Sequence, residues 1–329
     1  MKNSATILVT GVHGFTGGHL ARRLAGDAHC VKGLVRKPAD AEALKRHGIE
    51  PVLGDLSDPE SIRDICRGVD TVYHIAALYR QEGDPAPFFK VNAEGVRHLL
   101  ESAERHNVSR FVHCSTVGVH GDIKSPPADE NAPLAPGDHY QVSKLEGEKI
   151  ARAFMEAGRL PISIFRPAPI YGPGDLRLLK MFRAVKRRRF PMIGSGKPYY
   201  HMVYIDDLVD GIIRCGTLPQ AVGGTYILAG PDCVNMNELV RIIAAEFGTT
   251  PLGVHIPVAP VKLAGALCEA VCRPFGIDPP LHRRRVSFFE KSRSFDISKA
   301  KAEIGYEPKV SIREGVHRTA MWYATQGLL

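Results

Sequence analysis

Short runs of apolar residues alternate in the first half of the chain with longer segments whose apolar residues recur every three or four positions. The short runs predict β-strands, and the longer spacing predicts amphipathic helices. Strands are predicted at residues 5–10, 30–35, 50–53, 69–75, 110–114 and 161–166, and helices at 39–47, 59–66 and 87–105. Because such alternation builds a parallel sheet with helices on both faces, we expect an α/β fold with a doubly wound parallel sheet.

The pattern loosens after residue 166. Helices are predicted at residues 178–189, 236–247, 298–304 and 312–326, a strand at 202–205, and a helix cap at Asp206 or Asp207. We expect residues 1–165 to form the sheet domain. Residues 166–329 are expected to form mainly a smaller C-terminal lobe that binds the substrate, with some segments returning to the sheet domain.

An apolar segment at residues 258–271 predicts a helix interrupted only by Lys262 and Glu269. Such a helix can line an apolar substrate pocket, lie on a membrane surface, or pack as a core helix under the second lobe. We expect the core position.

The composition is that of a soluble globular protein, because 44% of its 329 residues are hydrophobic and 24% are charged. No segment approaches 18 uncharged apolar residues, and the N-terminus leads directly into a predicted strand, so we expect neither a transmembrane span nor a signal peptide. The seven cysteines are odd in number and contain no Cys-x-x-Cys pair. We therefore expect no disulfide framework and no metal site, as in a reduced cytoplasmic protein.

The net charge of +8 comes from the second half of the chain. Residues 1–159 hold 20 Lys and Arg against 21 Asp and Glu, whereas residues 160–329 hold 23 against 14, with basic clusters at 186–189 and 283–285. Aromatic residues do not alternate with the basic ones as in a single-strand binder, so we expect no nucleic-acid partner. The excess indicates a solvated basic face or an anionic small-molecule substrate.

A glycine-rich turn follows the first predicted strand and leads into a helix. It contains Gly11, Gly14 and Gly17, with Phe15 and Thr16 between the last two. Glycines there let backbone N–H groups approach a pyrophosphate at the helix N-terminus, where the helix dipole favours an anion. The turn predicts dinucleotide binding; the alternative is a purely structural turn.

Residues that directly follow the other strands form the second group of candidates, because ligands of parallel sheets bind beyond the carboxyl ends of the strands. They are Arg36, Asp55, Leu56, Ala76, Ala77, Ser115 and Thr116. Arg36 stands where NAD-selective folds usually carry an acid, so it favours the 2′-phosphate of NADP, unless it is a solvated loop residue. Asp55 either accepts a hydrogen bond from the adenine amine or forms the turn into the next helix.

Tyr140 and Lys144 lie four positions apart on a predicted helix. Residues with this spacing share one helix face, so the ammonium of Lys144 can lie beside the phenol of Tyr140. A nearby positive charge lowers the pKa of a phenol, which would let Tyr140 exchange a proton with a substrate hydroxyl near neutral pH. Alone, this spacing is also typical of a solvated helix face.

Eight motifs occur in a characteristic order and spacing across about residues 5–210. They are Thr10-Gly11-x-x-Gly14-Phe15-x-Gly17, Gly54-Asp55-Leu56, His74-x-Ala76-Ala77, Val91-Asn92-x-x-Gly95, Ser115-Thr116, Tyr140-x-x-x-Lys144, Arg166-Pro167 and Tyr171-Gly172-Pro173. Together they resemble an extended short-chain dehydrogenase/reductase of the NAD-dependent epimerase/dehydratase family. The form of residues 166–173 and the apolar segment at 258–271 are more similar to 3β-hydroxysteroid dehydrogenase and dihydroflavonol reductase relatives.

The resemblance implies a Rossmann-type sheet that binds NAD(P), with Pro167 joining the strand-end residues as a cofactor contact. It implies that Tyr140 is the general acid/base, that Lys144 lowers the pKa of Tyr140 and bonds the nicotinamide ribose, and that Thr116 positions the reacting oxygen. Ser115 is not expected to act in catalysis, and Asn92 is expected to be structural or to hold water. A homodimer formed through the 87–105 helix and the Tyr140 helix is also implied.

The resemblance narrows the reaction further. Dehydratases of this kind usually follow the active Thr with Asp-Glu, whereas Val117 and Gly118 follow Thr116, so we do not expect dehydration. Nucleotide-sugar members commonly carry Asn and Arg at the positions of Pro169 and Tyr200, and Arg177 or the 186–189 cluster is the candidate replacement. Predicted substrate contacts are Thr116, Tyr171, Arg177 and Tyr200.

Our leading hypothesis is an NAD(P)-dependent oxidoreductase that interconverts a secondary alcohol and a ketone. The alternative is a nucleotide-sugar 4-epimerase that uses tightly bound NAD. A non-catalytic NADP-sensing or scaffold protein is a third hypothesis, and the presence of Thr116, Tyr140 and Lys144 argues against it.

Overall fold

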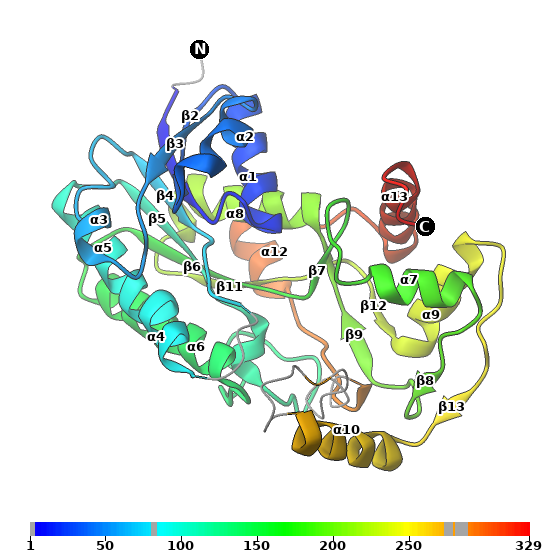
Figure 1. Ribbon diagram of the computed structural model, residues 1–329. Helices are drawn as coiled ribbons and strands as arrows, with labels where there is room; N and C mark the ends of the chain where they lie inside the picture. Colours follow the sequence, from blue (N-terminus) through cyan, green and yellow to red (C-terminus); the bar gives the residue numbers. More distant parts are fainter. Residues whose placement is uncertain (1–3, 80–83, 273–278, 280–288) are drawn as a thin grey trace.

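The sheet domain is built as the alternating pattern predicts. The computed structural model describes residues 4–79, 84–272, 279 and 289–329. Seven parallel strands form one sheet in the order β11-β6-β5-β4-β1-β2-β3 (Figure 1). They are β1 Thr6–Thr10, β2 Cys30–Val35, β3 Ile49–Leu53, β4 Thr71–His74, β5 Arg110–Cys114, β6 Ile162–Pro167 and β11 Thr225–Leu228. The expected Rossmann-type doubly wound sheet is confirmed.

Helices cover both faces of this sheet (Figure 1). On one face α1, α8 and α12 pack into a core that contains Val9, and on the other α3, α5 and α6 pack into a core that contains Leu8. Neighbouring strand residues point to opposite faces, which is why Leu8 and Val9 belong to different cores. The bounds are α1 Phe15–Gly26, α3 Pro59–Ile62, α5 Gly95–Arg105, α6 His139–Glu156, α8 Ile205–Thr217 and α12 Ser298–Ile304.

The helix predicted at 87–105 consists of α4 Ala86–Phe89, a π-helical turn η2 Lys90–Glu94, and α5. The side chain of Asn92 in the π-helical turn holds the loop after β4, because its Oδ1 accepts from the Leu78 N–H at 2.7 Å and its Nδ2 donates to the Leu78 carbonyl at 3.0 Å. Helix α6 packs directly beside this turn: a Cβ at Gly147 would lie 2.1 Å from the Asn92 carbonyl oxygen. Asn92 therefore has the structural role expected of it.

Segments beyond β6 contribute to both parts of the molecule. Strand β11 and helix α8 return to the sheet domain, while small two-stranded sheets and further helices form the second lobe (Figure 1). Its elements are β7 Ile170–Tyr171, α7 Leu179–Lys186, β8 Met192–Ile193, β9 Tyr199–His201, β10 Val203–Tyr204, β12 Cys233–Asn235, α9 Met236–Glu246, β13 His255–Ile256, α10 Val258–Cys272 and α13 Ile312–Thr325. The helices predicted at 178–189, 236–247, 298–304 and 312–326 are thus confirmed.

Helix α10 confirms the helix predicted at 258–271 but not its expected place in the core. Leu263, Leu267 and Val271 are each more than 60% exposed, and no residue of α10 lines the large cavity described below. Only Gly265 and Glu269 are buried. The core position is therefore wrong, because the apolar side of this helix faces outward. No helix in the part of the chain that the structure describes is long and apolar enough to span a membrane.

Three local predictions are corrected by the structure. Asp206 and Asp207 do not cap a helix, because α8 begins at Ile205 and Asp207 instead accepts from the N–H groups of Lys309 and Val310. The strand predicted at 202–205 is split, with β10 ending where α8 begins. The helices predicted at 39–47 and 59–66 are shorter, with α2 spanning Ala41–Lys45. The basic cluster at 283–285 lies outside the described residues.

Candidate active site

A cavity of about 980 Å³ opens beyond the carboxyl ends of the sheet strands. The strand order reverses between β1 and β4, and ligands of doubly wound sheets bind at such a reversal. Residues from both halves of the chain line the cavity, and every residue predicted to bind the cofactor is among them. These residues are Gly11, Gly14, Phe15, Thr16, Gly17, Arg36, Asp55, Leu56, Ala76, Ala77, Tyr140, Lys144 and Pro167.

The glycine turn forms a cradle that larger residues would fill. Gly11 has a φ of +73°, and a Cβ there would lie 2.9 Å from the Ala76 backbone. A Cβ at Gly17 would lie 2.3 Å from the Gly11 carbonyl oxygen. Gly14 is the N-cap of α1 and offers no side chain to the first helical N–H groups. The cradle at this helix N-terminus therefore fits the pyrophosphate of a dinucleotide.

Arg36 and Asp55 lie at the β2 and β3 end of the cavity. Asp55 forms the turn that was one of its two predicted roles, because its Oδ1 accepts from the N–H and the hydroxyl of Ser57, both at 2.8 Å. Burial would raise the pKa of Asp55, but these bonds and the charges of Arg36 and Lys90 lower it. Asp55 thus remains a carboxylate facing the cavity beside an exposed arginine.

Thr116 and Ser115, at the end of β5, point in different directions. The Thr116 hydroxyl lines the cavity and its Oγ1 accepts from the Gly118 N–H at 3.1 Å, which caps the short 3₁₀ helix Val117–His120. The hydroxyl of Ser115, which is buried, instead donates to Oε2 of Glu148 at 2.5 Å. The Ser115 hydroxyl is thus engaged by Glu148, and the expectation that Thr116 rather than Ser115 acts in catalysis stays a prediction.

Tyr140 lies in the first turn of α6, which Asp138 caps by accepting from the Gln141 N–H at 2.8 Å. The half-buried Tyr140 ring meets the Tyr79 ring edge to face, with centroids 5.0 Å apart. Both tyrosines line the cavity, as do Thr116 and Gly118 after β5. The phenol is therefore held by a fixed helix turn and an aromatic neighbour.

Lys144 lies one turn further along α6 and is buried. Its Nζ donates to the Cys114 carbonyl at 2.5 Å, which ties α6 to the end of β5. Burial lowers the pKa of Lys144, while nearby Cys114 and Glu148 raise it. The ammonium is thus aimed at the strand end that carries Thr116.

Lys144 was expected to lower the pKa of Tyr140, but other groups shift this pKa in the structure. Burial, together with Cys114, Tyr79 and Asp138, raises the pKa of Tyr140, and the cation that opposes this shift is Arg177. Burial therefore keeps the phenol protonated around neutral pH, and the Lys144 ammonium is engaged by the Cys114 carbonyl instead. The phenol of Tyr140 is therefore a protonated group at the cavity wall.

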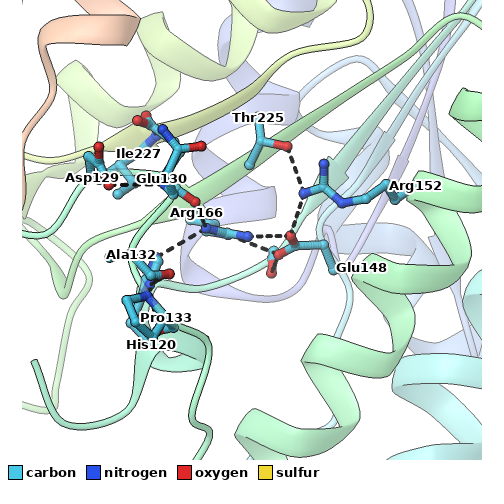
Figure 2. Close-up of polar contacts among 12 residues, drawn as sticks. His120, Asp129, Glu130, Ala132, Pro133, Glu148, Arg152, Arg166, Thr225 and Ile227 are labelled. Carbon is cyan, nitrogen blue, oxygen red and sulfur yellow. Dashed lines mark hydrogen bonds and ion pairs between the residues drawn. The ribbon is translucent and has the colours of Figure 1, made fainter.

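A buried ionic network supports the site from beneath (Figure 2). Glu148, one turn beyond Lys144 on α6, accepts from Arg166 of β6 through Nη2 at 2.6 Å and Nε at 3.1 Å. Arg152 adds a bond to Oε1 at 3.0 Å. Arg166 also donates to the Glu130 carbonyl at 3.0 Å and lies 3.1 Å from His120 Nε2. The network joins α6, β6 and the chain after β5.

The second lobe lines the other end of the cavity. Arg177 lines it, anchored by its Nε on Asp175 at 2.6 Å and by its Nη2 on the Ile170 carbonyl. Tyr200 lines it as well. Tyr171, a third predicted contact, does not: it is buried, and a Cβ at Gly315 would lie 2.0 Å from its hydroxyl. The core beneath the lobe takes this ring, so its predicted substrate role is corrected.

The basic cluster at 186–189 begins with the last residue of α7 and is exposed. It does not line the cavity, so it does not supply the missing arginine. The structure adds lining residues that the sequence did not predict, namely Tyr79, Leu178, Met181, Arg293 and Phe295. Arg293 reaches the cavity by pairing with Tyr200. Arg293 belongs to none of the eight motifs, so local sequence patterns could not identify it.

Known proteins are similar to this chain over nearly its whole length. A model of the NAD dependent epimerase/dehydratase family matches residues 7–229. The chain is 27% identical over 348 residues to 3beta-hydroxysteroid-dehydrogenase/decarboxylase isoform 1 of Arabidopsis thaliana, covering 95% of this chain and 78% of that protein. It is 28% identical over 324 residues to 2-alkyl-3-oxoalkanoate reductase of Stenotrophomonas maltophilia, covering 95% and 97%.

A solved structure supports the same relationship. DesIV, a dTDP-glucose 4,6-dehydratase from Streptomyces venezuelae with NAD and TYD bound, superposes with a TM-score of 0.76 and 27% identity, covering 97% of each chain.

Proposed function

The chain belongs to the NAD dependent epimerase/dehydratase family of extended short-chain dehydrogenases/reductases, and from this we propose that it interconverts a secondary alcohol and a ketone by hydride transfer. The observation that carries the proposal is that Thr116, Tyr140 and Lys144 line the same cavity as the glycine cradle. Two relatives carry names that describe oxidation of a hydroxyl group and reduction of a keto group.

In the proposed reaction Tyr140 is the general acid/base. NAD(P), when bound, supplies or accepts the hydride. Because burial keeps the phenol protonated, Tyr140 donates its proton to the oxygen of the ketone, and the Thr116 hydroxyl donates a hydrogen bond to the same oxygen. Lys144 holds the nicotinamide ribose and, through Cys114, the end of β5. Reduction is the direction that this protonation state favours.

The glycine cradle and the strand-end residues are proposed to hold the cofactor. The N-terminus of α1 would hold the pyrophosphate, and Arg36 and Asp55 would hold the adenosine end. Because Arg36 is an exposed guanidinium at the end of β2, we propose that it binds a 2′-phosphate and favours NADP.

The sequence indicated either an apolar or an anionic substrate, and the cavity contains residues that suit both. Leu178, Met181 and Phe295 offer apolar surface, and Arg177 and Arg293 offer positive charge. We therefore propose a substrate with an apolar body and an acidic group near the reacting carbon. A 3-oxo acid has this chemistry, and one relative is named for it.

Matched substrates test this proposal. Reduction of a 3-oxoalkanoate is compared with that of the methyl ketone lacking the carboxyl group, by following NADPH absorbance. The acid is expected to give at least a tenfold higher kcat/KM, and Arg177→Gln is expected to remove most of the difference. Tyr140→Phe should lower kcat by about 10²–10⁴-fold with NADPH affinity retained. Unchanged activity in Tyr140→Phe would remove the proposed role of this phenol, and Tyr73→Phe, in the core, serves as the control.

The alternative, a nucleotide-sugar 4-epimerase, is favoured by Arg177 and Arg293, since two guanidinium groups also suit a diphosphate. An epimerase would retain NAD through purification and turn over with no net change in nicotinamide absorbance. An oxidoreductase would consume NAD(P)H in a one-to-one ratio with product. A protein that binds NADP and turns over neither substrate class would support the non-catalytic hypothesis.

A further inference from the structure

Tyr140, Lys144 and Glu148 recur every four residues along α6, which places them on one face of that helix. We propose that Glu148 is a positioning residue for the proposed reaction: it holds the charge of Lys144 in the protein interior and fixes α6 against the strand end that carries Thr116. The inference rests on the proposed function only where it concerns the effect of Glu148 on turnover. The effect of Glu148 on the charge of Lys144 does not depend on any substrate.

The carboxylate of Glu148 is itself fixed. It is 1% exposed, and its two oxygens accept four hydrogen bonds, from Arg166 twice, from Arg152 and from Ser115. Burial would raise the pKa of Glu148, but the bonds and charge of Arg166 lower it. A buried carboxylate with every acceptor position used remains charged and cannot rotate freely.

The partner of Glu148 is fixed in turn. Arg166, 1% exposed, spans from Glu148 to the Glu130 carbonyl and to His120 (Figure 2). A guanidinium has only donors, so His120 Nε2 accepts this bond and its Nδ1 carries the hydrogen, 3.2 Å from the Ala132 carbonyl. The Glu148 carboxylate is therefore held by Ser115, Arg152 and Arg166, and Arg166 connects it to Glu130 and His120.

Lys144 needs such a counter-charge. The groups that act on it are Cys114 of β5 and Glu148 of α6, and it acts in turn on the buried His74 of β4 and His113 of β5. Burial raises the pKa of Cys114 to about 11, so its thiol is neutral near pH 7. Burial keeps both imidazoles neutral as well. Glu148 is thus the charged group among them that opposes the ammonium.

Glu148 and Lys144 each contact the chain at the end of β5, which connects both residues to the site as well as to the fold. Glu148 holds Ser115, the direct neighbour of Thr116, and the carbonyl of Cys114, one residue earlier, receives the Lys144 ammonium. One helix face therefore sets the distance between the phenol of Tyr140 and the hydroxyl of Thr116. Loss of the carboxylate would change both the charge of Lys144 and this distance.

The direct test is a titration of Lys144 in the full chain. Protein labelled with ¹³C-lysine, with the signal assigned by Lys144→Arg, is titrated by NMR in the wild type, Glu148→Gln and Glu148→Asp. Glu148→Gln is expected to move the Lys144 titration about one pH unit or more downward, because an opposite charge has been removed. Glu148→Asp keeps the charge and is expected to stay near the wild type. Glu104→Gln breaks the surface pair with Arg159 and serves as the control.

Turnover gives the second measurement. In Glu148→Gln the pH profile of kcat is expected to shift in the same direction as the Lys144 titration, with NADPH affinity little changed. A folded Glu148→Gln protein whose Lys144 titration matches the wild type overturns the inference. If Glu148→Gln does not fold, Glu148→Asp provides the test. A Lys144 titration in Glu148→Asp that differs from the wild type by more than one pH unit overturns the inference. Absence of oxidoreductase activity with a shifted titration would count against the proposed function and leave this inference standing.

Discussion

The hydroxyl of Ser115 donates a hydrogen bond of 2.5 Å to Oε2 of Glu148, so the residue beside Thr116 is fastened to the helix that carries Tyr140 and Lys144. Ser115 thus lines the cavity while its hydroxyl is engaged by Glu148. The two elements of the proposed proton-transfer geometry, β5 and α6, are joined by this bond and by the bond from Lys144 to the Cys114 carbonyl.

Breaking the buried ion pair of Arg166 is expected to destabilise the fold strongly. In Arg166→Met, Glu148 would lose its bidentate partner in the interior, and the free energy of unfolding should fall by about 3–5 kcal/mol. Urea unfolding followed by circular dichroism measures the change. Arg159→Met, which breaks the surface pair with Glu104, should have a far smaller effect, and an equal loss in both variants would contradict the buried pair's importance.

Two glycines of α1 are expected to respond oppositely to alanine. Gly17→Ala would place a Cβ 2.3 Å from the Gly11 carbonyl oxygen, so it should cost about 1–3 kcal/mol of stability and weaken NADPH binding. Gly26→Ala meets no atom within 4 Å and should stabilise the helix by up to about 1 kcal/mol. Unfolding curves and NADPH fluorescence titrations are the measurements. An unchanged NADPH affinity in Gly17→Ala would contradict the proposal that the glycine turn binds the cofactor.

Arg36 is expected to set the preference for NADP. Arg36→Ala removes a charge-assisted bond to the 2′-phosphate, worth about 1.5–3 kcal/mol, so NADPH affinity should fall at least tenfold. NADH affinity should be nearly unchanged. Arg46→Ala, an exposed arginine outside the cavity, is the matched control. Equal losses for NADPH and NADH in Arg36→Ala would assign Arg36 a structural role.

The raised pKa of Tyr140 predicts different pH profiles for the two reaction directions. Ketone reduction needs the protonated phenol, so its rate should persist to alkaline pH and fall only as the pH approaches the raised pKa. Alcohol oxidation needs the phenolate, so it should rise with pH above neutrality. Initial rates in both directions between pH 6 and 10 test this. A reduction rate that already falls near pH 7 would show a phenol with a lowered pKa.

Buried histidines should make the protein sensitive to acid. Burial lowers the pKa of His74 to about 3, below its ordinary value near 6.5. A depressed value means that the stabilisation is full above pH 6.5 and is lost as the pH falls toward 3, at about 1.4 kcal/mol for each pH unit. Urea midpoints between pH 7 and 4.5 should therefore decline less in His74→Asn than in the wild type. His47→Asn, at an exposed position, should leave the decline unchanged.

Local patterns predicted the sheet well, because strand runs and the glycine turn are determined by neighbouring residues. The strands at 30–35 and 110–114 have the predicted bounds. Helix ends were less predictable: α3 ends at Ile62 because the chain enters turns there. The homodimer and the cytoplasmic location stay predictions.

The cavity lining contributed by the second lobe could not be predicted, because it depends on contacts between residues far apart in the sequence. Arg293 reaches the cavity because it pairs with Tyr200, far earlier in the chain. The Tyr171 motif indicated a substrate contact, yet the ring fills the space beside Gly315. The exposure of the apolar side of α10 could not be predicted either, because an apolar run has the same sequence pattern whether it is buried or exposed.

The cavity is lined by residues from both halves of the chain, and this has a practical use. Any molecule that touches both Gly14 and Arg177 would be released on unfolding, so binding should raise the melting temperature by thermodynamic linkage. At a hundred times its Kd such a ligand adds about 2.7 kcal/mol of stability. A thermal-shift screen of candidate 3-oxo acids with NADPH could therefore identify the substrate class before any turnover assay exists.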